Sequence, residues 1–278
     1  EASKFEKIWI VACGTAYHAG LFGKDLFEKV LGVPVSVELA SEFRYREPIV
    51  GKNDLGIVIS QSGETMDTIA ATELLKENGS HVLALVNVVG SSLARMADSV
   101  FYLHVGPEIG VASTKAYLGM LVSQLVIAKH WDAENKLDVS FDEIAELPKL
   151  IDHTMACEGQ IKEISEKIYK KNDIYFIGRG LDYALAAEGA LKLKEISYLH
   201  AEALAAGELK HGTLALIEKG TPVIVTASQN HLLDKTTSNV QEVIARGAYV
   251  IAIGDSESEK LENISNDYVT LPDSNEIL

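Results

Sequence analysis

The feature that most limits how this 278-residue chain can fold is an internal repeat. The apolar segment 8–14 aligns with 174–180, which lies 166 positions later. Three further apolar blocks repeat at nearly the same spacing, namely 57–60 with 223–226, 79–85 with 247–253, and 98–103 with 267–271. Four blocks in nearly one register indicate a tandem duplication, in which each copy is one structural unit.

Each copy alternates short apolar runs with helical segments. The runs are rich in Val and Ile and show no polar alternation, which is typical of strands covered on both faces. The segment 67–78 is one of the helices between them, and Gly79 ends it. The pattern predicts four strands and three helices per copy. Alternating strands and helices form a parallel sheet with right-handed crossovers, so we expect two tandem doubly wound α/β subdomains.

The repeat also predicts the domain boundaries. We expect a first subdomain over 1–135, a connecting helical hairpin over 136–170, and a second subdomain over 171–278. The second copy ends at Leu278, which corresponds to about Gly110 in the first copy. We therefore expect that at least one further helix follows and that the chain is part of a larger protein.

Composition excludes several classes of function. The formal net charge is −15 and the pI is about 5.0, which argues against sequence-independent binding to nucleic acid or to an anionic membrane. The longest apolar run, 116–128, is too short to span a bilayer, and no secretory signal opens the chain. Cys13 and Cys157 lie too far apart in sequence to suggest a disulfide framework or a zinc site, so a reducing cytoplasm is expected.

The segment Ser60–Thr65 is the sharpest local signal. It joins a predicted strand to a predicted helix through Ser60, Ser62 and Thr65, and such a junction offers free backbone N–H groups and a helix dipole to one phosphate. The chain lacks the Gly-Lys-Ser/Thr of a triphosphate loop and a complete dinucleotide fingerprint. The alternative is an ordinary capping turn, because Ser, Thr and Gly are common at such positions. The second copy has fewer hydroxyls at its matching turn, so one phosphate site per chain is expected.

A second candidate lies on the helix predicted from about 184 to 200. Glu188, Lys192 and Glu195 share one stripe of this largely apolar helix. The stripe is either a solvated face with weak ion pairs or a carboxylate pair held by a central ammonium, which could supply a base with a tuned pKa.

A third candidate is His211, which lies in a predicted turn between Lys210 and Gly212. A histidine there could move a proton near neutral pH, or could simply be exposed. The sequence contains no metal-ligand spacing, so we expect no metal and no cofactor.

Taken together, these motifs resemble the sugar isomerase (SIS) family. Within it, the chain resembles the isomerase regions of the glutamine–fructose-6-phosphate aminotransferases, or glucosamine-6-phosphate synthases, almost from end to end. The segments that carry the resemblance are 13–15, 60–65, 108–115, 195–198 and 208–212. It implies two SIS-type, flavodoxin-like subdomains with flanking helices.

The resemblance also implies roles for individual residues. The phosphate of fructose 6-phosphate or glucosamine 6-phosphate would be held by Ser60, Gln61, Ser62 and Thr65. The sugar would be lined by Cys13, Gly14, Thr15, Val111 and Ser113. Glu195 would move the proton between C1 and C2, His211 would assist ring opening from the neighbouring subunit of a homodimer, and Lys192 and Glu188 would position and polarise the site.

Two departures from the family pattern qualify this assignment. Ala16 stands where the family often has Ser, which removes one hydroxyl worth about 1 kcal/mol. The glutaminase domain and the C-terminal tail with its Schiff-base lysine are absent, so this chain alone is expected to isomerise slowly or only to bind. Another SIS sugar-phosphate isomerase or deaminase and a non-catalytic sugar-phosphate sensor remain alternatives.

Overall fold

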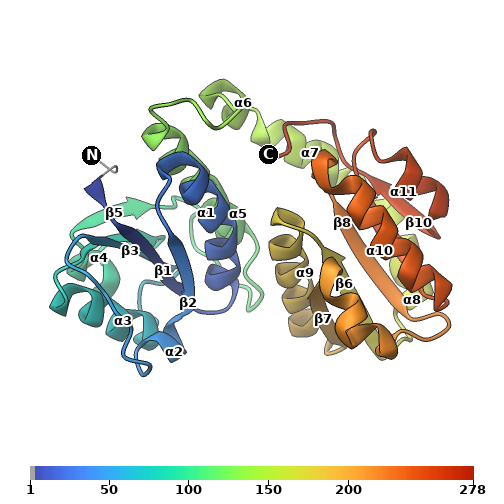
Figure 1. The fold of residues 1–278 in the computed structure, drawn as a ribbon, viewed down its shortest axis with the longest axis horizontal. Helices are drawn as coiled ribbons and strands as arrows, with labels where there is room; N and C mark the ends of the chain where they lie inside the picture. Colours follow the sequence, from blue (N-terminus) through green and yellow to red (C-terminus); the bar gives the residue numbers. More distant parts are fainter. Residues whose placement is uncertain (1–3) are drawn as a thin grey trace. The chain divides into compact units, whose positions relative to one another are not determined.

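A computed structural model describes residues 4–278 of the chain, which divides into two compact units between Phe141 and Asp142 (Figure 1). No helix in this described range is both long and apolar enough to cross a membrane.

The first unit is a five-stranded parallel sheet in the order β2-β1-β3-β4-β5. Its strands are β1 (Lys7–Ala12), β2 (Val35–Leu39), β3 (Asp54–Ser60), β4 (His81–Val86) and β5 (Ser99–Tyr102). Its helices are α1 (Thr15–Leu31), α2 (Ala40–Phe43), α3 (Met66–Glu77), α4 (Ser92–Met96) and α5 (Lys115–Trp131). Helices α1 and α5 pack together on one face of the sheet and α2, α3 and α4 cover the other (Figure 1). Every residue of the central strand β3 is buried as a result.

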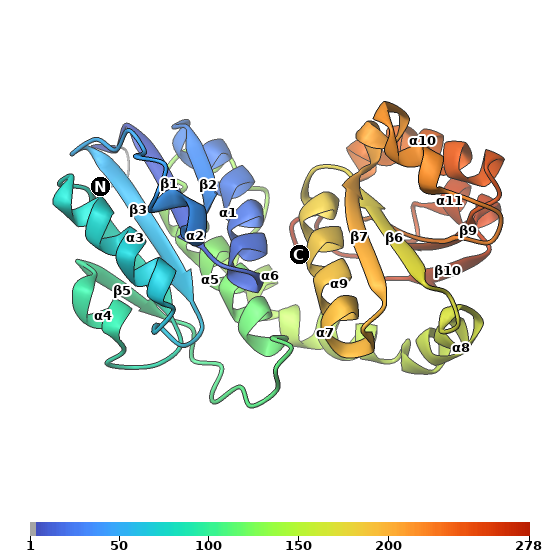
Figure 2. The ribbon, with the colours of Figure 1, turned by 90° about the horizontal axis from the view of Figure 1, so that it is seen from below.

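The second unit repeats this sheet in the order β10-β9-β8-β6-β7. Its strands are β6 (Asp173–Gly178), β7 (His200–Ala205), β8 (Pro222–Ala227), β9 (Tyr249–Gly254) and β10 (Asp267–Thr270). Its helices are α8 (Glu158–Ile168), α9 (Leu181–Ser197), α10 (Leu233–Ala245) and α11 (Glu259–Ile264), with the 3-10 turns η2 (Ala206–His211), η3 (Thr213–Leu216) and η4 (Asn230–Leu232). Helices α8 and α9 cover one face, with α9 running beside β6 and β7 (Figure 2), while η2, α10 and α11 cover the other.

The duplication is visible in backbone detail. Gly14 and Gly180 precede α1 and α9 with φ 55° in both copies and ψ −129° and −128°. At the far edge of the sheets, the N–H of Val82 bonds the Asp98 carboxylate, and that of Val250 bonds the Asn266 side-chain oxygen, both at 2.8 Å. The predicted fold class, two tandem parallel α/β subdomains, is confirmed.

The strand register corrects the alignment of the two copies. Val11 pairs with Val58 in the first sheet and Ile177 pairs with Val225 in the second, so β3 and β8 are 167 positions apart rather than 166. Ser60 therefore corresponds to Ala227, not to Thr226 as the sequence comparison suggested. Consequently the second copy lacks the first hydroxyl of the Ser60–Thr65 turn.

Each sheet has one more strand than predicted. The additional strands, β2 and β7, lie at sheet edges and are only partly buried, so they lack the continuous apolar run that marks the central strands. The sequence of β7, His-Ala-Glu-Ala-Leu-Ala, is also favourable for a helix. The sequence predicted that the preceding helix runs to about His200. Helix α9 ends at Ser197 instead, and Tyr198 caps it with φ 61°.

The connecting segment is helical but is not a simple hairpin. It contains α6 (Phe141–Ala145), α7 (Leu147–Met155) and α8. Ile164 and Ile168 of α8 are buried in the core cluster that includes Phe176. Helix α8 is thus part of the second unit, because its apolar stripe covers one face of that sheet.

Candidate functional site

A pocket of about 240 Å³ lies in the first unit, where β1 and β3 end and α1, α3 and α5 begin. Its lining residues are Cys13, Thr15, Ala16, Ile59, Ser60, Gln61, Ser62, Thr65, Ser113 and Met120. The carboxyl ends of strands in a parallel sheet are the usual place for a ligand in this fold class. Seven of the nine substrate-binding residues predicted from the sequence meet here, and Ile59 and Met120 add apolar surface.

The turn between β3 and α3 forms one wall of this pocket. Ser60 Oγ accepts the N–H of Gly63 at 3.1 Å and lies 3.1 Å from Thr65 Oγ1, while Ser62 Oγ accepts the N–H of Glu64 at 3.2 Å. The Ser60 and Thr65 hydroxyls thus contact each other, and Ser62 adds a third hydroxyl within the same six residues. The turn is thus a cluster of hydroxyls held by the chain's own backbone.

Two helix N-termini border the pocket. Gly14 precedes α1 and has no side chain, and Thr65 precedes α3 with its hydroxyl against Ser60, so neither residue caps its helix through a side chain. The first N–H groups of a helix carry the positive end of its dipole. The described lining residues include no Lys or Arg, so an anion bound here would be held by dipoles and hydroxyls.

The third wall comes from the segment before α5. Ser113 lines the pocket, and its hydroxyl donates to Glu108 Oε2 at 2.8 Å. The other Glu108 oxygen accepts the N–H of Thr114 at 2.8 Å and that of Ala116 at 3.4 Å. Burial alone would raise the pKa of the Glu108 carboxyl, but these hydrogen bonds and the nearby Lys115 outweigh it and hold the pKa below its usual value. Glu108 was part of the resembling motif but was given no role.

Val111 and Gly14 are not among the lining residues. The Val111 side chain is 95% exposed, and Gly14 contributes the left-handed backbone that leads into α1. Their predicted contacts with a sugar remain predictions.

The charged stripe on α9 lies in the second unit. Lys192 Nζ is 3.4 Å from Glu188 Oε1 and also forms an ion pair with Glu195. The side chains of Glu188, Lys192 and Glu195 are 5%, 18% and 29% exposed. The alternative of a solvated face does not hold for Glu188, since a carboxylate this buried needs a partner such as Lys192.

His211 is exposed at the end of η2 in the same unit. Its neighbour Lys210 pairs with Glu242 of α10 at 2.9 Å. The segment around His211, which the sequence predicted as a simple turn, is a 3-10 helix. It follows β7, a strand that was not predicted. Among residues 4–278 no group of three or more His, Cys, Asp or Glu side chains could hold a metal ion.

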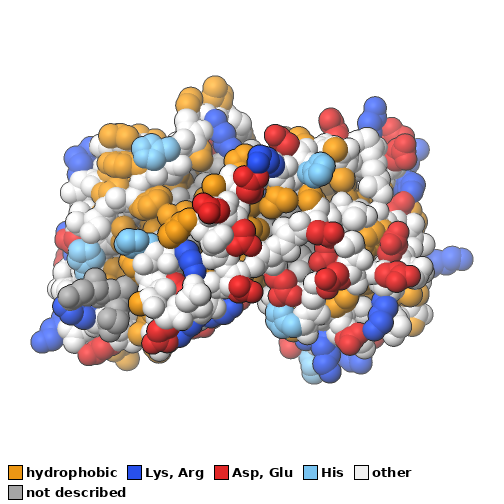
Figure 3. All heavy atoms as spheres, turned by 90° about the horizontal axis from the view of Figure 1, so that it is seen from above, with side chains coloured by type: hydrophobic (Ala, Val, Ile, Leu, Met, Phe, Trp, Pro, Cys, Tyr) orange, Lys and Arg blue, Asp and Glu red, His pale blue; other side chains and the backbone are white. Residues whose placement is uncertain are grey.

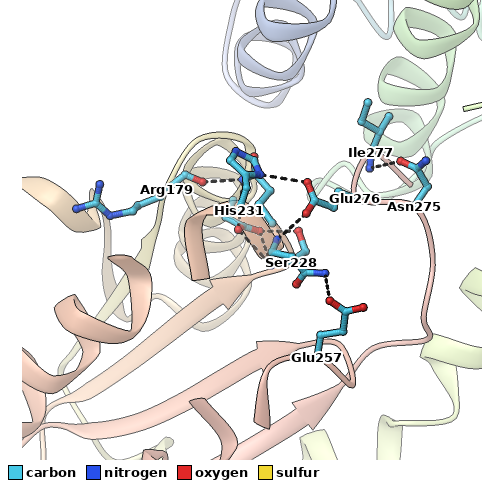
Figure 4. Close-up of polar contacts among 10 residues, drawn as sticks. Arg179, Ser228, His231, Glu257, Asn275, Glu276 and Ile277 are labelled. Atoms are coloured by element: carbon cyan, nitrogen blue, oxygen red, sulfur yellow. Dashed lines mark hydrogen bonds and ion pairs between the residues drawn. The ribbon is translucent and has the colours of Figure 1, made fainter. Parts of the chain in front are cut away.

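The matching turn of the second copy is occupied by the chain's own carboxylates (Figure 4). Asp182, at the position of Ala16, accepts the N–H and the hydroxyl of Ser228 at 3.1 and 2.8 Å. Glu276 accepts the N–H of Asn230 at 2.7 Å and lies 3.2 Å from His231 Nδ1. Burial raises the pKa of Asp182, and its bonds from Ser228 and Gln229 oppose that rise. Asp182 was not foreseen from the sequence, and one anion site per chain remains a prediction.

The molecular surface fits an acidic protein. The face drawn in Figure 3 carries many Asp and Glu side chains, especially over the second unit, with Lys and Arg scattered among them. No continuous basic patch is visible on this face, in keeping with a net charge of −15.

Comparisons with known proteins agree with this architecture. The chain is 47% identical over 285 residues to the glutamine–fructose-6-phosphate aminotransferase (isomerizing) of Clostridium acetobutylicum, and 50% identical over 280 residues to that of Caldanaerobacter subterraneus. These alignments cover 100% and 99% of this chain but 47% and 46% of the relatives, so the chain spans about half the length of the curated relatives it matches.

A solved structure is similar throughout. The C-terminal domain of glucosamine-fructose-6-phosphate aminotransferase from Francisella tularensis superposes with a TM-score of 0.91 at 41% identity, covering 99% of this chain and 80% of that one. The SIS domain family matches residues 3–129 and 167–277. Because both halves match the same family and both form the same five-stranded sheet, the chain belongs to the SIS domain family.

Proposed function

We propose that the chain binds fructose 6-phosphate and glucosamine 6-phosphate and carries out ketose–aldose isomerisation, as the isomerase domain of a glutamine–fructose-6-phosphate aminotransferase. The observation that carries this proposal is the pocket of the first unit, in which a hydroxyl-rich turn and two helix N-termini meet. The names of the relatives support the choice of sugar phosphate.

The proposed binding mode divides the ligand between the walls of the pocket. Ser60, Gln61, Ser62 and Thr65 hold the phosphate through hydroxyls and backbone N–H groups at the start of α3. Thr15, with the Cys13–Gly14 turn, and the segment of Val111 and Ser113 line the sugar.

The proposed chemistry is a proton shift between C1 and C2. Glu195 removes the proton from C1 of the open-chain ketose, an enediol forms as the C2 oxygen gains a proton, and Glu195 returns its proton to C2 as the C1 hydroxyl loses its own. His211 assists ring opening, and Lys192, bound to both carboxylates of the α9 stripe, stabilises developing negative charge with Glu188 as its anchor.

The whole protein is proposed to make glucosamine 6-phosphate from fructose 6-phosphate and glutamine. Its glutaminase domain and C-terminal tail lie outside this sequence in the proposal. If His211 acts from a neighbouring subunit, a homodimer in the cytoplasm is the minimum functional unit.

Thermal shifts test the binding proposal. We expect fructose 6-phosphate and glucosamine 6-phosphate to raise the melting temperature of the chain, because a ligand that binds only the folded state stabilises it, while fructose without phosphate has no effect at the same concentration. Equal shifts with and without the phosphate would contradict the assignment of the Ser60–Thr65 turn.

Hydrogen–deuterium exchange at C1 and C2 tests the catalytic proposal. Glu195→Gln in the full-length protein is expected to slow exchange about 10²–10⁴-fold, the contribution of a general base, with sugar-phosphate binding retained. Glu163→Gln, at an exposed position of α8, is the matched control. Wild-type exchange in Glu195→Gln would overturn the assignment of Glu195 as the base. A wild-type protein that binds the sugar phosphate but exchanges no proton would leave a non-catalytic sugar-phosphate sensor as the better description.

A further inference from the structure

The hydrogen bond between Ser113 and Glu108 determines what Ser113 can offer a ligand. A serine hydroxyl has one proton and can accept further hydrogen bonds, whereas an ionised carboxylate only accepts. The Glu108 carboxyl has a pKa below its usual value and is ionised at neutral pH, so the 2.8 Å bond takes the only proton of Ser113. Towards the pocket, Ser113 can then act only as an acceptor.

The opposite wall of the pocket has the reverse polarity. The Ser60 and Ser62 hydroxyls each accept a backbone N–H, which leaves their own protons uncommitted by those bonds. One proton is shared between Ser60 and Thr65. In this part of the described structure, the hydroxyls of Ser60, Ser62 and Thr65 carry three protons. The Ser60–Thr65 bond uses one of them, and two are left for a ligand.

We propose that Glu108 is a positioning residue that makes Ser113 an obligatory acceptor and thereby orients the ligand in the pocket. A phosphate dianion has only acceptor oxygens and suits the donor-rich turn at Ser60–Thr65. A sugar hydroxyl or an amino group can donate and suits Ser113. The inference rests on the proposed sugar-phosphate function and adds to it a rule for which end of the ligand faces which wall.

Glu108 is well held for this role. Its second oxygen accepts the N–H groups of Thr114 and Ala116, which places the carboxylate at the start of α5 and aims the first oxygen at Ser113. Substitution by Gln keeps one acceptor for the backbone but puts an amide N–H₂ opposite Ser113. The amide would donate to Ser113, and the serine proton would then turn towards the pocket.

A double-mutant cycle on binding tests the inference. Isothermal titration of fructose 6-phosphate into Glu108→Gln, Ser113→Ala and the double variant is expected to show about three- to tenfold weaker binding in each single variant, the effect of one hydrogen bond. The double variant should bind as weakly as the single variants and no weaker, because Glu108 acts through Ser113. Inorganic phosphate, titrated in the same way, should bind all four proteins within twofold.

Asp132→Asn is the matched control for losing a loop-holding carboxylate. Asp132 accepts the N–H groups of Lys136 and Leu137 at 2.7 and 2.8 Å at the other end of α5, and is not a lining residue. The Asp132→Asn variant should bind fructose 6-phosphate and inorganic phosphate as tightly as the wild-type chain does. Ser113→Ala leaves the backbone bonds of Glu108 intact, so it tests the contact of Ser113 with the sugar even if Glu108→Gln folds poorly, and unchanged affinity in Ser113→Ala alone overturns the inference.

The outcomes separate the two proposals. Suppose the wild-type chain binds fructose 6-phosphate. If the single variants then keep its affinity, or if their losses multiply in the double variant, the role of Glu108 is overturned and the proposed function stands. Equal weakening of phosphate and sugar phosphate also overturns it. A wild-type chain that binds no sugar phosphate overturns the proposed function, and this inference with it.

Discussion

Gly63 shows how a single residue shapes the pocket. Its φ of 66° is in the left-handed region, and a Cβ atom built on it would lie 2.1 Å from Ser91 Oγ. The carbonyl of Gly63 accepts the N–H of Leu93 at 3.0 Å, so the turn is held against the start of α4. Only glycine satisfies both the backbone conformation and the close approach.

Gly63→Ala is therefore expected to destabilise the first unit more than a similar substitution elsewhere. The left-handed conformation costs about 1–2 kcal/mol for Ala, and overpacking against Ser91 adds about 1–3 kcal/mol. Gly90→Ala is the matched control, because Gly90 has φ 71° but no atom within 4 Å of the added Cβ. Urea denaturation measures the loss of unfolding free energy in each variant. Equal losses in Gly63→Ala and Gly90→Ala would show that the contact with Ser91 is easily relieved.

At the scale of elements, the duplicated edge of the sheet provides an internal comparison. The carboxylate of Asp98 and the amide of Asn266 make the same bond to the preceding strand, but only Asp98 titrates. Burial alone would raise the pKa of Asp98. The bonds from Lys76 and Val82, with the charges of Lys76 and His81, outweigh burial and lower it below 3.8.

Asp98→Asn is expected to remove part of the acid sensitivity of the first unit. A lowered pKa contributes stability that is present above the unfolded value of 3.8 and is lost as the pH falls through the folded value. At pH 7 the variant should lose at most about 1 kcal/mol of stability, because the side chains of the Lys76–Asp98 pair are about a third exposed. This gap in stability between wild type and variant should close below pH 3.8. Urea titrations from pH 3 to pH 7 measure it, and a gap that widens at low pH would contradict the assignment.

At the scale of the molecule, binding and chemistry are assigned to different units. All the residues that line the pocket precede Phe141, whereas Glu188, Lys192, Glu195 and His211 follow Asp142. The two sheets have separate buried cores, such as the cluster around Phe43 and the one around Val225. Each unit thus contains the apolar core that a domain needs.

A fragment of residues 1–141 is expected to fold and to bind phosphate monoesters but to exchange no protons at C1 or C2. The reason is that it keeps the pocket and loses the proposed base. Thermal shift with fructose 6-phosphate and the exchange measurement check both parts. A folded fragment that does not bind would show that the second unit supplies essential contacts.

Much of the architecture was predictable because the signals were local. The central strands are continuous apolar runs, and the Ser60–Thr65 turn combines small hydroxylated residues with a glycine between strand and helix. The edge strands β2 and β7 were missed because their sequences carry no such run and their strand conformation depends on pairing with β1 and β6. The roles of Glu195 and His211 remain proposals.

The sequence by itself determined the duplication, the α/β class and the position of the hydroxyl-rich turn, since periodicity and turn chemistry act between near neighbours in the chain. Tertiary structure alone decided that Ser113 joins Ser60 in one pocket, that Glu108 takes the proton of Ser113, and that Asp182 occupies the matching turn of the second copy. Two of these arrangements, the Ser60–Ser113 pocket and the Asp182–Ser228 contact, join residues about 50 positions apart, and all of them depend on where strands and helices end in the folded sheet.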